Sequence, residues 1–207
     1  MENKKPTQFL MKPKVDFCFK ELMEDEEVRN AFLAAVLGID LGEIVESRIL
    51  PSHLRQKDKD DKLGILNFIM FDDEEYYSRF HFWSDKGRKL YSDKFEIHTL
   101  ELPKLAKHDY PETELLKWLQ FINAETEEEF EMAAEKSEYI KKAYEDLNRI
   151  SADEEKRLEY EERERAIRDH QYFSTVYKNT GLKEGRREGR QEGRQEGRQE
   201  GIQAVVE

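Results

Sequence analysis

The feature that most constrains this chain is an apolar run at residues 63–71, the longest in a very polar sequence. Only Gly64 and Asn67 interrupt it, and Ile and Phe are prominent among the rest. A run this short, with charged residues on both sides, is typical of a strand buried on both faces, although a buried helix has a similar composition. The length favours the strand, so we expect the core to form around it.

The 207 residues suffice for one ordinary domain, or for a small domain with a helical extension. Charged residues make up 40% and hydrophobic ones 37%, which predicts a small core and much solvated helix. The net charge of -12 argues against broad attraction to nucleic acid or anionic membranes, although a local basic site stays open. The single cysteine, Cys18, has no disulfide partner and no zinc-site spacing, so we expect a small buried side chain.

No apolar run approaches the ~18 residues that a membrane-spanning helix needs. The first residues also lack an apolar stretch of signal-peptide length. We therefore expect a cytoplasmic protein with no membrane partner.

Two short helices and a strand are expected before the apolar run. Asp16 can cap the first helix. The second has apolar residues three and four apart at 28–37 and ends at Gly38, a residue common just past a helix. Residues 44–50 suggest a short strand that stops at a proline.

The middle third reads as β structure. Alternating polar and apolar residues predict half-exposed strands at 76–83 and 94–102, with Gly87 at a turn position suited to positive φ. His81 and His98 fall on the polar faces of these strands and are not at metal-ligand spacing, so we expect surface roles. We therefore expect these strands to form one sheet of three to five strands.

The C-terminal half reads as helix. Capping-box patterns begin at Thr126 and Ser151, each with Glu three residues later. Residues 125–164 hold sixteen acidic and seven basic residues, so most of the negative charge lies on one helical segment. A solvated helix face is the interpretation that this charge favours.

Residues 181–207 contain a four-residue repeat in which Gly, Glu and Arg each recur. At 100° per residue, the Glu and Arg stripes lie about 160° apart on a helix, so they barely meet within one copy. Each interior Gly also costs ~1 kcal/mol relative to Ala. We expect this helix to be marginal alone and stable when paired, because the Glu stripe of one copy can meet the Arg stripe of another.

Several pieces of the sequence together resemble one known family. They are Asp16-Phe17-x-Phe19-Lys20, residues 61–66, residues 71–105 and the Glu-Gly tail. The combination resembles the bacterial recombination-promoting nuclease and transposase family of the PD-(D/E)xK nuclease superfamily, in pieces that span nearly the whole chain. The resemblance implies an α+β fold: a small mixed sheet in a truncated nuclease-like core, then a helical region, then a Gly-repeat helical tail. The expected divisions are 1–110, 111–180 and 181–207.

The resemblance implies Mg²⁺-dependent DNA cleavage, with DNA as the partner. In such sites an Asp at a strand end and a Glu on the neighbouring strand hold Mg²⁺, which activates water and stabilises charge on the phosphate. A Lys or Gln two positions after the Glu orients the nucleophile.

The sequence departs from the family at this motif. Asn67 follows the Leu-Gly-Ile-Leu strand where family members carry Asp, and no Glu-x-Gln occurs between it and the C-terminal helices. Glu192 and Glu196 have a similar pattern but lie in the Gly repeat. An internal loss that joined two similar strands accounts for this most simply. We therefore expect that this chain binds no Mg²⁺, although the family implies it.

The remaining candidates are few. Asp16, Asp61 and Asn67 are the candidate catalytic positions, and Asp61 and Asp72 are the candidate metal ligands. For each acid, loop solubility or helix capping is the competing interpretation. One hypothesis is a degenerate nuclease relative that associates with itself or with a full-length relative through its C-terminal helices. The other is an active Mg²⁺-dependent endonuclease whose carboxylate site has been rebuilt.

Overall fold

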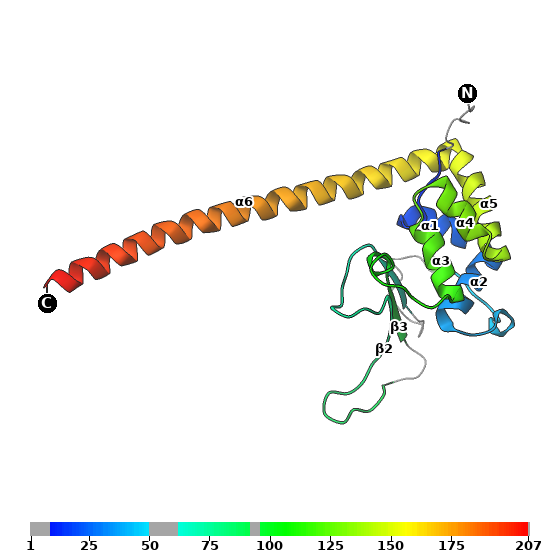
Figure 1. Ribbon diagram of the computed structural model, residues 1–207, viewed down its shortest axis with the longest axis horizontal. Helices are drawn as coiled ribbons and strands as arrows, with labels where there is room; N and C mark the ends of the chain where they lie inside the picture. The colour runs from blue at the N-terminus through cyan, green and yellow to red at the C-terminus, as the bar shows by residue number, and fades with distance from the viewer. Residues whose placement is uncertain (1–8, 50–61, 92–95, 207) are drawn as a thin grey trace. The chain divides into compact units, whose positions relative to one another are not determined.

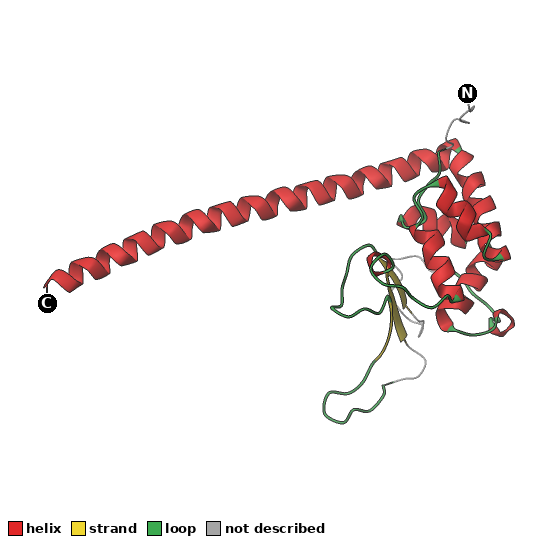
Figure 2. Ribbon diagram, in the orientation of Figure 1, coloured by secondary structure: helices red, strands yellow, loops and turns green. Residues whose placement is uncertain are grey.

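The computed structural model describes residues 9–49, 62–91 and 96–206 (Figure 1). The chain divides into two units, which we call the N-terminal unit (residues 1–160) and the C-terminal unit (residues 161–207). Helices and a small sheet build the first, and one helix forms the described part of the second (Figure 2). This confirms the α+β fold class, whereas the three-part division expected from the sequence stays a prediction.

Two helices begin the N-terminal unit, α1 (Asp16–Met23) and α2 (Glu26–Leu37). Asp16 does not cap α1 as expected: Val15 is the cap residue, and Asp16 lies in the first turn. Asp25 caps α2, since its side chain accepts hydrogen bonds from two backbone N–H groups of the first turn. Gly38 ends α2 with φ of 67°, as the sequence predicts.

The sheet has three strands, β1 (Lys62–Leu66), β2 (Tyr77–His81) and β3 (Glu96–Glu101), in the order β1-β3-β2. β1 pairs with β3 in parallel, and β2 pairs with β3 antiparallel. The apolar run is therefore not the central strand. It forms an edge strand that ends at Leu66, and Phe68 and Met70 beyond it are 58% and 56% exposed. The central strand is β3. The sequence predicts a strand there but not its central position, because its polar side chains are buried in pairs with other charged groups.

Two further local expectations were wrong. Residues 44–49 form no strand, and a short 3-10 helix at Leu41–Glu43 precedes them. In the turn after β2, positive φ falls on Arg88, at 45°, and not on Gly87. The segment that follows this turn makes a single bridge, Trp83 to Leu90, among the described residues.

Helices follow β3 and a short 3-10 helix at Leu102–Lys104. They are α3 (Glu114–Asn123), α4 (Glu127–Ala134), α5 (Glu138–Ala152) and α6 (Glu154–Val206). The capping box at Thr126 is confirmed. The one expected at Ser151 is wrong, because Ser151 is buried and its hydroxyl accepts a hydrogen bond from Met11 N at 3.0 Å. Asp153 accepts from Lys156 N at the start of α6 instead.

The core of the N-terminal unit is largely aromatic and lies among its helices. Rings of Phe19, Phe32, Trp118, Phe121, Phe130 and Tyr144 form an edge-to-face and stacked series. Leu100 and Leu102 join the same cluster, so the sheet and the helices share one core. Cys18 is fully buried there, as expected, and burial raises the pKa of its thiol.

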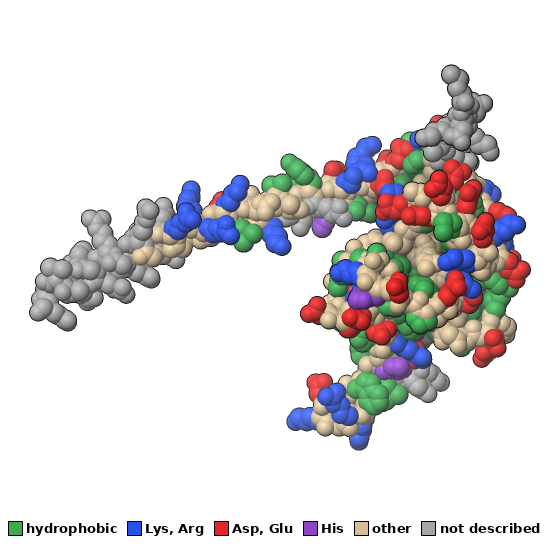
Figure 3. Space-filling model, in the orientation of Figure 1, with side chains coloured by type: hydrophobic (Ala, Val, Ile, Leu, Met, Phe, Trp, Pro, Cys, Tyr) green, Lys and Arg blue, Asp and Glu red, His purple; other side chains and the backbone are tan. Residues whose placement is uncertain are grey.

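None of the helices in the described parts of the chain is both long and apolar enough to cross a membrane. Figure 3 shows Asp and Glu side chains spread over the visible face of the N-terminal unit. Along the described part of the C-terminal unit it shows basic and hydrophobic side chains on an exposed helix.

Candidate functional site

Asn67 lies directly after β1, where the family resemblance implies a catalytic Asp. Its side chain is exposed, and Nδ2 lies 3.4 Å from the backbone oxygen of Lys14, to which it donates. This contact joins the end of β1 to the segment that precedes α1. A neutral amide supplies no charge to hold a divalent cation, so Asn67 is a weaker candidate ligand than the Asp that the resemblance implies at this position.

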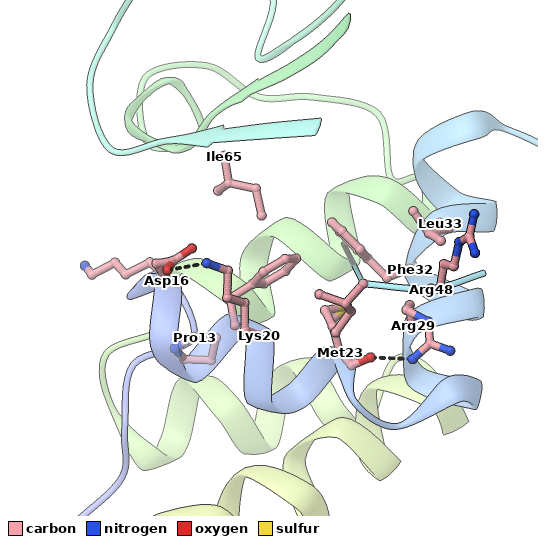
Figure 4. A pocket seen from close by; sticks show the side chains of 12 residues that line it. Pro13, Asp16, Lys20, Met23, Arg29, Phe32, Leu33, Arg48 and Ile65 are labelled. Atoms are coloured by element: carbon pink, nitrogen blue, oxygen red, sulfur yellow. Dashed lines mark hydrogen bonds and ion pairs between the residues drawn. The ribbon is translucent and has the colours of Figure 1, made fainter. Parts of the chain in front are cut away.

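A cavity of about 420 Å³ lies between α1, α2 and β1 (Figure 4). Asp16 and Ile65 of β1 both line it, so the structure brings Asp16 close to the strand that precedes Asn67. Asp16 is 70% exposed and accepts a hydrogen bond from Lys20 Nζ at 2.7 Å. Asp16 is the only acidic side chain among the described residues that line this cavity, and its carboxylate is already paired with the ammonium group of Lys20.

Basic residues are the other polar feature of this cavity. Those that line it are Lys14, Lys20, Arg29 and Arg48. Arg29 is fixed by its contacts, since it donates to the backbone oxygens of Met23 and Ser47 at 2.7 and 3.1 Å. Lys14 forms an ion pair with Glu125. These contacts connect α1 and α2 to neighbouring segments. Arg48 is the most exposed of the basic residues that line the cavity.

The acidic loop at residues 72–75 lies between β1 and β2 in the chain and contacts Lys104, just after β3. Asp72 is exposed there. Asp73 accepts from Lys104 Nζ at 2.7 Å, and this bond holds the pKa of Asp73 below its usual value. Lys104 is only 2% exposed and also lies 3.0 Å from Glu101 Oε1. Burial lowers the pKa of Lys104, but its two carboxylate partners outweigh burial and raise it overall.

Glu101, at the end of β3, fixes the backbone that follows β1. Its Oε2 accepts from the backbone N–H groups of Met70 and Phe71, at 2.6 and 3.3 Å. Burial raises the pKa of this carboxyl, but the bonds from Met70 and Lys104 outweigh it and hold the pKa below the usual value. Glu101 therefore acts as an anion that anchors a loop through Oε2, while its Oε1 lies beside the Lys104 ammonium group.

A second cluster surrounds Glu96 at the start of β3. Arg79 donates to both of its oxygens, at 2.6 and 2.5 Å, and His81 Nε2 lies 2.8 Å from Oε1. The bonds from Arg79 hold the pKa of Glu96 below its usual value despite burial. His98 Nε2 lies 3.3 Å from Oε2, and its Nδ1 lies 3.0 Å from the hydroxyl of Tyr77.

Sequence reasoning missed this cluster. His98 is 2% exposed, which corrects the expected surface role, and His81 is half-buried. The sequence shows only that polar residues alternate with apolar ones along each strand, which places the polar residues of one strand on the same face. Only the register, which sets Arg79 opposite His98 and His81 opposite Glu96, brings them together.

The carboxylates described here do not fit a Mg²⁺ site. Within residues 9–49, 62–91 and 96–206, no three His, Cys, Asp or Glu side chains are grouped so that they could hold a metal ion. Glu96 and Glu101 are bound to basic side chains, and Asp16 faces Lys20. A magnesium ion needs near-octahedral oxygen ligands, and each of these oxygens would first have to leave its cation. Asp61 lies outside the described residues.

Comparison with protein families finds a match to the PD-(D/E)XK nuclease family transposase model over residues 63–175. The chain belongs to this family. The match begins at the second residue of β1 and includes the rest of the sheet and α3 to α5, so it covers both carboxylate clusters. No curated protein and no solved structure showed a significant match.

Family membership confirms the resemblance that the sequence suggested. Nucleases of this type generally depend on a divalent metal ion, and membership of the family suggests an interaction with DNA. The structure assigns none of the candidate positions a role in that chemistry: Asp16 lines the cavity, Asn67 ends the strand, and Asp72 is exposed in a loop. Their catalytic and metal-binding roles stay predictions.

Proposed function

We propose that this chain is a family member that no longer cleaves DNA and that acts by associating with other chains. The observation that carries the proposal is the end of β1, where Asn67 is hydrogen-bonded to the backbone of Lys14 and Asp16 nearby is paired with Lys20. Neither position offers a free carboxylate at a strand end, which the family's two-carboxylate mechanism requires.

The central strand supports the same proposal. Glu96 and Glu101 are its buried acids, and each is held by a basic side chain and by further hydrogen bonds. A metal ion that displaced the nearly buried Lys104 would leave its ammonium group without the Glu101 partner, which is destabilising. Using either acid as a metal ligand would thus compete with interactions that stabilise the sheet.

In place of cleavage, the proposed function is association with other chains. The proposed association surface is the C-terminal unit, and its partner is a second copy of the chain or a full-length relative. Binding to DNA is expected to be weak and steeply dependent on salt, since the net charge is -12. A sub-micromolar dissociation constant for plain duplex at physiological salt would show that this charge argument is wrong.

A nicking assay tests the loss of cleavage. Supercoiled plasmid is incubated with the purified chain and Mg²⁺ or Mn²⁺, beside an active family member as the positive control. We expect no nicking by the chain. Asn67→Asp alone is expected not to restore it, because the Glu and Gln of the family motif are also missing.

An active nuclease with a rebuilt carboxylate site is the alternative. It is favoured by the position of Asp16, which shares a cavity with β1. Metal-dependent nicking that is abolished by Asp61→Ala or Asp72→Ala would overturn the main proposal and support this one. Glu46→Ala serves as the matched control, since Glu46 is an exposed acid outside the candidate set.

A further inference from the structure

We propose that the C-terminal unit pairs with a second copy of itself in parallel orientation, with both helices running in the same direction. This inference rests on the proposed function and specifies its partner and geometry. Three independent features of the helix carry it: an exposed apolar face, like charges that repel within one copy, and the order of charges around the glycines.

The first feature is an apolar face that is exposed in the described part of α6. Phe173 and Tyr177 are 55% and 74% exposed on α6, and Tyr172 and Val176 beside them are 67% and 41% exposed. Residues four apart lie on neighbouring turns of one helix face. Phe173 and Tyr177 are therefore in line with Gly181, the first glycine of the repeat, and together they form one stripe that a second helix can cover.

The second feature is the spacing of charges. From residue 184 onward, Glu recurs every four residues and so does Arg, and the two series are offset by two. The neighbours four apart on the helix therefore carry like charges, which destabilises a single helix. Glu184 has an opposite charge three residues later in Arg187, but each later Glu of the repeat has Gln at that position, so opposite neighbours for the rest of the repeat are available from a second chain. The repeat contains both signs in equal spacing, so a second copy supplies them.

The third feature selects the direction. Each of Gly185, Gly189, Gly193 and Gly197 has Glu before it and Arg after it. At 100° per residue, the Glu lies on one flank of the glycine stripe and the Arg on the other. In a parallel symmetric pair, the Glu flank of each helix faces the Arg flank of its partner on both sides. In an antiparallel pair, Glu faces Glu and Arg faces Arg.

The glycines permit the close approach that these charge pairs need. A stripe with a period of four advances about 40° per repeat around a straight helix, so the two helices cross or coil instead of lying flat together. Small residues at such a contact let the two backbones approach closely. The aromatic residues before Gly181 then extend the contact toward the N-terminal end of the unit.

Distance measurements between spin labels at matched sites distinguish the orientations. Thr180→Cys and Gln203→Cys bracket the repeat and lie about 35 Å apart along the helix. The buried Cys18 should resist labelling, which the unmodified chain controls for. A parallel pair gives distances between identical sites below about 25 Å for both variants, since paired helices lie 8–10 Å apart. Any antiparallel pair gives about 35 Å or more for at least one.

The outcomes separate this inference from the proposed function. Two short distances support the parallel pair. A dimer with one long distance overturns the orientation and leaves association intact. A monomeric mass with no coupling between labels at tens of micromolar overturns both.

A charge exchange provides a second test. Replacing the four arginines that follow the glycines, Arg186, Arg190, Arg194 and Arg198, by Glu puts like charges on both flanks. The dissociation constant should rise about tenfold or more. Mixing this variant with one that carries Arg in place of Glu184, Glu188, Glu192 and Glu196 should restore pairing. Unchanged affinity in the first variant would overturn the role of the charges.

Discussion

The two units are both rich in helix, but they are stabilised in different ways. In the N-terminal unit, rings such as Phe32 and Trp118 are almost fully buried and pack edge to face at 5.7 Å. In the C-terminal unit, large apolar side chains such as Tyr172 and Tyr177 are mostly exposed. Burial of apolar surface is the main favourable term in folding. The first unit is therefore stabilised by its own core, whereas the described side chains of the second bury little apolar surface, and we propose that a partner chain covers them.

The largest expected effect comes from a cavity in the core of the N-terminal unit. Leu119 is fully buried on α3, and Leu119→Ala is expected to lower the free energy of unfolding by about 2–5 kcal/mol. Leu158→Ala is the control, because Leu158 is 59% exposed and should change stability by less than ~0.5 kcal/mol. Urea denaturation followed by tryptophan fluorescence measures both. Equal effects would contradict the assigned core.

A second, smaller effect is expected on dilution. If the C-terminal unit is stable only when paired, its helix should be lost as protein concentration falls, while the core around Trp118 stays folded. Far-UV circular dichroism of the full chain, compared with a 1–180 truncation, follows this loss. Helicity that is independent of concentration from about 50 to 1 μM would contradict the proposal that the C-terminal unit is stable only when paired.

A third effect concerns acid. The pKa values of Glu96 and Glu101 lie below their ordinary value of 4.5, so the unfolded chain binds more protons than the folded chain as the pH falls through this region. The stability they contribute is therefore fully present above pH 4.5 and is lost as the pH falls through their folded pKa values.

Glu101→Gln tests this contribution. The variant should be less stable at pH 7, because Lys104 loses a charged partner, and its stability should fall less steeply below pH 4.5. Glu46→Gln is the matched control, with an exposed side chain. Thermal unfolding measured from pH 3 to pH 7 gives both slopes. An unchanged slope in Glu101→Gln would show that this carboxyl does not hold a lowered pKa.

Sequence reasoning predicted the parts of the fold that depend on local signals. The end of α2 at Gly38, the capping box at Thr126 and burial of Cys18 follow from near neighbours or from residue type. The choice of central strand did not, because β3 is polar in sequence and is buried only through pairs such as Glu101 with Lys104.

The candidate site was predictable only in part. Asn67 at the strand end could be identified from the sequence, and the structure places it directly after β1. The pairing of Asp16 with Lys20 follows helical spacing and could also have been inferred. The cluster around Glu96 could not, because it depends on the register between β2 and β3, which sequence alternation leaves open.

The central claim is that this family member acts by association through its C-terminal unit. Light scattering of the full chain and of a 1–180 truncation tests it most directly, because the truncation removes the repeat and leaves the core intact. We predict a dimeric or larger mass for the full chain at tens of micromolar and a monomeric mass for the truncation. Equal, monomeric masses for both would contradict the claim.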